Sequence, residues 1–465
     1  MNTIRSENTT QPRKKRSLPK IVIYTGIVSG AILVFFFFAL LVFRNPLINW
    51  YARDTAADAF AKAYPGYSIH LGDLQYSVWK NTLECDSVSV LSSDSSMTGN
   101  LTDVSVSGIG WLDLFWHNEA AQVVFAQSSM DIQNLVLRFS PSGNEWHCQS
   151  LRVSIPDSVV VADSCKFFSN LETEEFFARS PSRQTRFTAS IPLAVMSGIN
   201  FRSILRGGSY QLRLIELRDV FAEILVNMDK PYKPDSLPPK MLNEAFASIK
   251  QKVSIENITV TNGRLRYGER VVVREAPGII SFDSANVSIR GISNQSVNTD
   301  TMQVIANGIF MNAAPMTLSL TMPLTADTFS LNYSGSLGRM DATVLNAFLE
   351  PCEHVRITSG NVKTAKYTVT VIDGRARGDI DVIYDELSLS ILDKTTGSAG
   401  GLWDQIASLY GNLFVIRGGN QRDGDGVLKK GKVRYRRHGE DLFLQFLWFS
   451  LRSGVADIVG FPQEE

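Results

Sequence analysis

The sequence predicts a mostly β protein, in which an elongated, repeat-like, curved β-sheet with short helices follows one N-terminal transmembrane helix. Three observations predict this fold. Residues 21–43 are apolar and uncharged. Beyond them, aliphatic residues alternate with serine and threonine, for example at 104–107, 318–322 and 387–391. A fixed spacing of apolar residues also recurs along the chain, as is typical of repeated structural units.

The apolar segment 21–43, which includes Ile21, Phe35 and Phe43, is expected to be a retained membrane anchor. A helix that rises about 1.5 Å per residue would span a hydrocarbon core roughly 30 Å thick. A basic cluster directly precedes it, formed by Arg13, Lys14, Lys15, Arg16 and Lys20. The positive-inside rule therefore assigns residues 1–20 to a cytoplasmic basic tail and exports the rest. A cleaved signal peptide is the alternative, but its apolar region is usually shorter and precedes a small-residue cleavage site.

Gly26 and Gly30 form a GxxxG motif inside this segment. Small residues at this spacing let two membrane helices approach closely, which predicts a homodimer through the two glycines. The motif is also frequent by chance in membrane helices, so an unpaired anchor is the alternative.

The charge balance argues against a nucleic-acid partner. Residues 1–20 carry six basic residues and one acidic residue, whereas the whole chain has 46 of each sign. The exported part therefore carries a net charge of −5, and phosphate binding requires a basic excess. The chain has 44% hydrophobic residues, which is enough for a folded core. Residues 44–465 exceed the usual size of one compact domain, so we expect several domains or one elongated repeat body.

Period-two alternation places the aliphatic side chains on one face of each strand and the hydroxyl groups on the other. A second pattern, with apolar residues three and five positions after a first one, begins at Cys85, Ile132, Leu217, Ile255 and Phe282. We expect the apolar faces to line a groove. The candidate lining residues are Val88, Val90, Val104, Val106, Leu135, Leu137, Val220, Ile258, Val260, Val287 and Ile289.

A direct internal repeat is consistent with this pattern. Residues 107–115 align without gaps with residues 197–205, and a strand pattern follows each copy. The repeat predicts an array in which neighbouring units continue one another's sheet. Chance similarity between short β motifs is the alternative.

These patterns divide the chain into seven segments. They are the tail 1–20, the anchor 21–43, a stalk helix at 44–66, a first β repeat region at 67–230, a linker and helix at 231–250, a second β region at 251–440 and an apolar C-terminal segment at 441–465. Short helices are expected at residues 111–116, 201–205, 237–250, 341–349 and 402–413.

No pattern typical of an enzyme is present. The five histidines are scattered, and the chain has no zinc-protease motif, nucleophile elbow, P-loop or dinucleotide fingerprint. We therefore expect no enzymatic activity, no cofactor and no metal site. Asp379 and Asp381 share a strand face near Asp385 and Glu386, which is compatible with a cation site. A solvated turn or edge is the favoured interpretation.

The four cysteines are not spaced as zinc or thioredoxin motifs require. In an oxidising compartment Cys148 and Cys165 could form a disulfide bond. Buried thiols are the equal alternative, because cysteine is a common core residue.

Two features near the C-terminus each have two interpretations. Lys432, Arg434 and Arg436 line one strand face, where they either protect an exposed sheet edge or contact anionic lipid head groups. The apolar segment 442–451 that follows is too short to span a bilayer. It either plugs the end of the β body or lies at a membrane interface as an amphipathic helix.

The order of these features resembles the AsmA-like family of bacterial envelope proteins, which includes the TamB-type relatives. The matching parts are the basic head with its single span, then residues 64–74, 83–91, 345–351, 355–361 and 374–392. The similarity covers most of residues 15–455. It implies a periplasmic β-sheet groove, anchored in the bacterial inner membrane with the N-terminus in the cytoplasm. Such a groove would shield lipid acyl chains and serve lipid transport and outer-membrane biogenesis.

The first hypothesis is therefore a lipid carrier or conduit, with membrane lipids as partners. The second is a structural or scaffolding envelope protein, with closed β-sandwiches that bind other envelope proteins. The prevalence of valine, isoleucine and leucine in the strands favours an open lining over a filled sandwich. Five Asn-x-Ser/Thr sites beyond the apolar segment leave a eukaryotic single-pass membrane protein as a further alternative.

Overall fold

The computed structural model describes residues 57–58, 60–110, 125–140, 142–206, 208–232, 238–295, 301–392, 417–420 and 428–460. Of these residues, 57% lie in strands and 15% in helices, so the prediction of a mostly β fold is confirmed. None of the helices in this part of the chain has both the length and the apolarity needed to cross a membrane. The anchor expected at 21–43, with its two glycines, and the helices expected at 111–116 and 402–413 lie outside the described residues.

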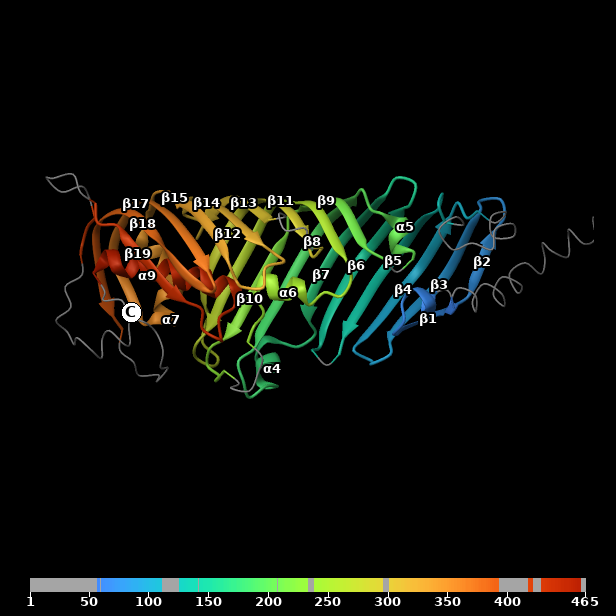
Figure 1. Cartoon of the computed structure of the whole chain (residues 1–465). Helices are drawn as coiled ribbons and strands as arrows, with labels where there is room; N and C mark the ends of the chain where they lie inside the picture. The colour runs from blue at the N-terminus through green and yellow to red at the C-terminus, as the bar shows by residue number, and fades with distance from the viewer. Residues whose placement is uncertain are drawn as a thin grey trace, which may run out of the picture.

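The described strands form one continuous sheet of 19 strands that runs the length of the molecule, not two stacked sheets (Figure 1). In the first half, β3 to β8 pair antiparallel in chain order, while β1 and β2 both pair with β3. These strands are β1 (Tyr67–Leu71), β2 (Leu74–Ser77), β3 (Thr82–Ser92), β4 (Met97–Ser107), β5 (Ser129–Phe139), β6 (Asn144–Ser154), β7 (Val159–Ser169) and β8 (Thr185–Ser197).

A broken strand joins the two halves of the sheet. β9 (Tyr210–Arg218) and β10 (Phe221–Asn227) follow one another along β8, and both pair with it antiparallel. The next strand, β11 (Val253–Arg270), runs parallel to both. Because parallel neighbours need a crossover connection, the chain returns through residues 228–252, which include α6 (Leu242–Ala247).

The second half is again antiparallel. β11 to β15 pair in chain order, β15 and β16 both pair with β17, and β18 and β19 complete the sheet. The strands are β12 (Gly278–Ser293), β13 (Thr301–Phe310), β14 (Ala314–Pro323), β15 (Leu331–Leu337), β16 (Met340–Asp341), β17 (Val355–Ile372), β18 (Arg375–Ile391) and β19 (Gly431–Arg436).

A line of backbone irregularities crosses the sheet and explains the apolar spacing of three and then two in most of the five sets. In three of the five sets, one residue between the first two apolar positions has a positive φ angle. These residues are Asn134 (54°), Asp219 (54°) and Ser284 (48°). Each adds one residue to its strand, so the apolar side chain three positions later returns to the same face. Such bulges also bend and twist strands, which fits the curvature of the sheet.

Neighbouring strands contribute further members of this line. Asp103, Ser164 and Asn262 also have positive φ angles, of 48°, 52° and 55°. The pairing shifts around Asp103 and Asn262 place these bulges beside those of the adjacent strands. The Asn262 amide group donates to Asp219 Oδ1 at 2.6 Å, which joins two bulges directly.

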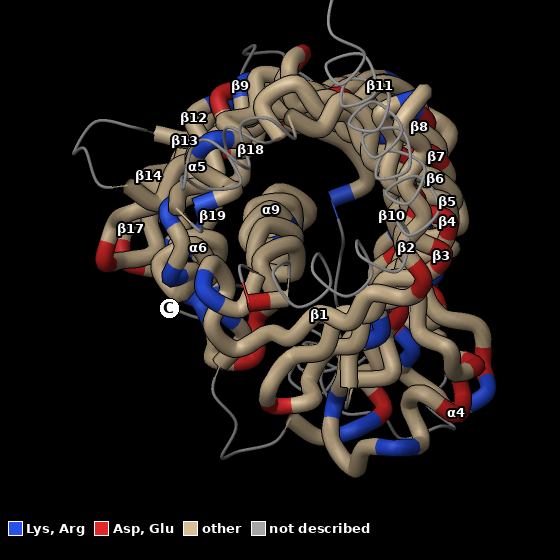
Figure 2. The backbone as a smooth tube through the Cα atoms, turned by 90° about the vertical axis from the view of Figure 1, so that its right-hand side faces the viewer, with Lys and Arg blue, Asp and Glu red and all other residues tan. Residues whose placement is uncertain are grey.

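Viewed end-on, the strands form a ring around α9 (Phe443–Val459), whereas α4 (Thr173–Ala178) lies outside it (Figure 2). The other short helices are α5 (Phe201–Ile204), α7 (Asn346–Glu353) and the 3-10 turn η1 (Ala342–Leu345). The helices expected at 201–205, 237–250 and 341–349 are therefore present, although α6 is shorter than predicted. Of the expected stalk helix at 44–66, the described end, residues 60–63, is helical.

The internal repeat has a structural counterpart. Ser107 ends β4 and Ser197 ends β8, and each is followed by a glycine with positive φ, Gly108 at 74° and Gly198 at 67°. The next residue is a buried isoleucine in both copies. Equivalent backbone and burial at equivalent positions support a real repeat over coincidence.

Cys148 and Cys165 form a disulfide bond between β6 and β7. They are directly opposite in the strand register, with their Cα atoms 4.0 Å apart. Of the two interpretations left open by the sequence, the disulfide is therefore the one found. Cys85 and Cys352 are free thiols.

Candidate functional site

The candidate lining residues of the first half lie on one face of the sheet. In the strand register, residues directly opposite one another point to the same side. The register gives two apolar rows: Val88, Leu101, Leu135 and Cys148, and then Val90, Gly99, Leu137 and Trp146. Val104 and Val106 belong to the same face, because Val104 lies in one apolar cluster with Val88 and Val106 packs against that cluster. The sequence-predicted lining of β3 to β5 is thus brought together.

The candidates of the second half continue this face. Leu217 on β9 is opposite Val260, which in turn is opposite Val287 on β12. One step along the same strands, Ile258 is opposite Ile289. Val220 lies in the break between β9 and β10 and is half-buried. These side chains therefore extend the apolar face across the parallel junction.

What covers this face differs between the two halves. In the second half, Ile258 and Ile289 pack against a large core that includes Met241 beside α6 together with Phe446 and Ile458 of α9. A second core there contains Phe348 of α7. Residues of α6, α7 and α9 thus belong to the cores of this half. Ile258 and Ile289, predicted as lining residues, pack against this helix-containing core and are therefore partly covered.

In the first half, the apolar clusters consist of strand residues only. One cluster centres on Leu74, Val88 and Ile132, and the other surrounds the Cys148–Cys165 disulfide. Val88 and Val104 are each 7% exposed, whereas Val90, Val106, Leu135 and Leu137 are only half-buried. No residue of a described helix belongs to either cluster. The apolar face therefore remains partly open to solvent over this half.

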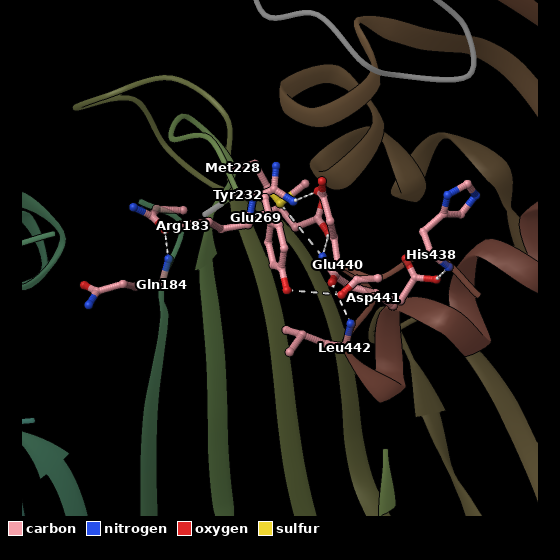
Figure 3. A network of polar contacts seen from close by, with 12 residues as sticks. Arg183, Gln184, Met228, Tyr232, Glu269, His438, Glu440, Asp441 and Leu442 are labelled. Carbon is pink, nitrogen blue, oxygen red and sulfur yellow. Dashed lines mark hydrogen bonds and ion pairs between the residues drawn. The ribbon is translucent and has the colours of Figure 1, made fainter. Parts of the chain in front are cut away.

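Polar contacts fix the beginning of α9 against β11 (Figure 3). Gln445 donates through Nε2 to Glu269 Oε1 at 2.9 Å, and its own Oε1 accepts from the Leu442 backbone N–H at 3.1 Å. The Tyr267 hydroxyl donates to the same Glu269 oxygen at 2.5 Å. Burial raises the pKa of Tyr267, and the neighbouring Glu269 raises it further, so the phenol remains a donor.

The apolar segment 442–451 is therefore part of the β body. Phe446 and Ser450 are fully buried, and the Tyr333 hydroxyl lies 2.5 Å from Ser450 Oγ. Of the two interpretations of this segment, the structure corresponds to a plug inside the end of the sheet. The sequence analysis did not predict that α7 also packs inside this end of the sheet. Phe348 and Leu349 are apolar, but their spacing alone does not show which face of the sheet the helix covers.

A cavity of about 290 Å³ lies at the other end, beside β2, β3 and β4. Its lining residues are Asp73, Gln75, Glu84, Cys85, Asp86, Asp103, Val104 and Ser105. Four carboxyl groups make this cavity unsuited to an acyl chain, because burying ionised groups beside hydrocarbon is costly. Cys85 and Val104, which also line it, connect it to the apolar cluster around Val88.

The acidic cluster on β18 is accounted for by ion pairs. Asp379 pairs with Lys432 at 2.6 Å, and Asp385 pairs with Lys363 at the same distance. Asp381 lies 3.5 Å from Lys430. In the described part of the chain, no group of three or more acidic, histidine or cysteine side chains is placed to hold a metal ion.

Lys432, Arg434 and Arg436 are exposed on β19, on the side away from α9. The sequence pattern does not distinguish these three residues, but their charged neighbours in the structure differ. Lys432 has an acidic partner in Asp379, whereas Arg434 and Arg436 are opposite Arg377 and Arg375 on β18. The sequence analysis did not single out Arg375 and Arg377, although they are two residues apart directly after a turn, which predicts that they share one strand face.

The chain matches no protein-family model and no curated protein.

Proposed function

We propose that this chain is a membrane-anchored, AsmA-like envelope protein that shields or transfers lipid along the apolar face of its first half. The observation that carries the proposal is the half-buried apolar surface of β3 to β7, to whose clusters no described helix contributes a residue. Apolar area left in water is unfavourable at roughly 25 cal/mol per Å². An acyl chain is a ligand that removes this surface from water without polar recognition.

The energetics of such binding are sufficient. Burial of a methylene group contributes about 0.8 kcal/mol, so part of one acyl chain supplies substantial affinity. Shielding a lipid tail needs an apolar lining and no reactive group. This agrees with a chain whose sequence has no catalytic motif, and the proposed function involves neither an enzyme reaction nor a cofactor.

An oxidising compartment is part of the proposal. The Cys148–Cys165 disulfide supports it, because disulfide bonds persist mainly outside the cytosol. We propose that residues 21–43 anchor the chain in the bacterial inner membrane, with residues 1–20 in the cytoplasm and the sheet in the periplasm. In that place the protein would support outer-membrane lipid homeostasis.

Native mass spectrometry of the full chain, extracted in mild detergent, tests the proposal. We expect lipid adducts on the unmodified protein and their loss in Leu137→Asp, because a carboxylate on the apolar face opposes acyl-chain binding. Val136→Asp is the matched control, since Val136 is the adjacent, equally half-buried residue on the opposite face of β5. Absence of lipid on the unmodified protein, or equal loss in both variants, would contradict the proposal.

A further inference from the structure

Four arginines lie together on the outer face of β18 and β19. Arg375 is directly opposite Arg436, and Arg377 is directly opposite Arg434. All four side chains are exposed, and none forms an ion pair with a described residue. We call these four residues the arginine patch. With Asp373 in the adjoining turn, the net charge of this corner of the sheet is +3.

The same pair of strands shows that this arrangement is not imposed by the fold. Further along the ladder, Asp379 is opposite Lys432 and pairs with it at 2.6 Å. Like charges directly opposite one another destabilise a sheet, whereas opposite charges stabilise it. The ladder thus changes from complementary pairs to repelling pairs over two positions. Contacts within the folded chain do not explain why these four arginines lie opposite one another.

Protection of the sheet edge does not provide that explanation. Arg375 and Arg377 are on β18, which has a paired strand on both sides. The edge of β19 is already covered by α9. The backbone N–H of Lys432 donates to Asp457 Oδ2 at 2.8 Å, and that of Arg434 donates to Ser453 Oγ at 3.2 Å. Charged side chains are therefore not required to prevent strand addition here.

An exposed apolar residue borders the patch. Ile372, the last residue of β17, is 67% exposed and directly opposite Arg375. Ile372, Arg375 and Arg436 thus form one row across three strands on the same face. An aliphatic side chain beside several arginines is suited to an anionic membrane surface, because the arginines bind phosphate oxygens and the apolar group enters the interface.

We propose that the arginine patch and Ile372 dock on the surface of a bilayer that contains anionic phospholipids. Planar guanidinium groups recognise phosphate by paired hydrogen bonds, and each basic residue close to such a surface adds to the attraction. This docking surface is on the outer face of the sheet and involves none of the inner apolar residues. The inference is therefore independent of the proposed lipid-shielding function.

Vesicle binding by the full chain tests the inference. The protein is placed in phosphatidylcholine nanodiscs and mixed with vesicles of phosphatidylcholine alone or with about one-third phosphatidylglycerol. We expect binding to the anionic vesicles only. Arg434→Gln with Arg436→Gln should weaken it roughly 30-fold, about fivefold for each arginine. Ile372→Ser should weaken it as well, and neither variant should unfold at a lower temperature than the unmodified protein, because removing like charges relieves repulsion.

The matched control removes two positive charges from the same ladder. Lys430→Gln with Lys432→Gln affects lysines already paired with Asp381 and Asp379, so we expect a much smaller loss. Equal losses in the two double variants, or equal binding to neutral and anionic vesicles, would overturn the inference. Displacement of the vesicles by inorganic phosphate at constant ionic strength would also overturn it, because it would indicate a free-anion site.

Discussion

Arg183 and Glu440, which are 257 positions apart in the sequence, form an ion pair in which Nη1 and Oε2 are 2.9 Å apart. Arg183 precedes β8 in the first half of the sheet, whereas Glu440 lies in the turn between β19 and α9. The Tyr232 hydroxyl adds a hydrogen bond to the Gly439 carbonyl oxygen at 3.2 Å. The C-terminal turn is thus tied to the middle of the chain, which fixes the start of α9 inside the ring (Figures 2 and 3).

The first prediction concerns the packing of α9. Phe446 is fully buried between Phe329 and Tyr435, with ring centroids 5.0 and 5.6 Å away. We expect Phe446→Ala to lower the free energy of opening of α9 by about 3–5 kcal/mol, because the lost ring leaves a cavity. Hydrogen exchange of the α9 amides measures this. Val455→Ala, at a 43% exposed position of the same helix, should cost below about 1 kcal/mol. Similar effects of both substitutions would show that α9 is not a packed plug.

The second prediction is a pH dependence at α6. Arg437 binds Glu244 through two hydrogen bonds of 2.7 and 3.2 Å. These bonds lower the pKa of Glu244 below 4.5, against the opposing effect of burial, and the Met241 N–H contributes further. Because the folded state binds the proton less tightly than the unfolded one, the stabilisation exists above the unfolded pKa and is lost as the pH falls.

We therefore expect the free energy of opening of α6, measured by hydrogen exchange, to fall between about pH 5 and about pH 3. In Glu244→Gln this fall should be smaller, since glutamine does not titrate. An unchanged pH dependence in the variant would mean that other carboxyl groups cause it.

The third prediction tests the line of bulges. Asn134 has a φ angle of 54°, a region that glycine adopts freely and that costs β-branched residues roughly 1–2 kcal/mol. We expect Asn134→Val to lower the free energy of unfolding by about this amount and Asn134→Gly to be nearly neutral. Gln133→Val is the control at the adjacent exposed position, where φ is not positive. Equal destabilisation by both valine substitutions would show that the bulge imposes no strain.

Much of the sheet could be predicted from the sequence because its signals are local. Alternation of aliphatic and hydroxyl residues, as at 318–322, determines which face of a strand is apolar. The spacing from Ile132 to Leu135 and Leu137 was recognisable as a pattern, and its cause is the positive φ of Asn134. The apolar rows of β3 to β5 followed directly from these two periodicities.

The remaining features depend on contacts between distant segments. The parallel pairing of β9 and β10 with β11 has no local signal, because a strand sequence does not specify the direction of its neighbour. Likewise, Arg377 and Arg434 meet only through the register of β18 and β19. Whether Ile289 faces a ligand or a helix depends on where α6 and α9 pack, so the sequence could not separate open from covered parts of the apolar face.

Site-specific photo-crosslinking tests the central claim most directly. A photoreactive residue is placed in the full chain at Val106 or Leu137 on the half-buried apolar face, at Ile289 against the helix-containing core, or at Val136 on the outer face. In cells that contain labelled phospholipid, we predict lipid adducts at Val106 and Leu137 and none at Ile289 or Val136. Adducts at all four positions, or at none of them, would contradict the account of an open lipid-binding face in the first half of the sheet.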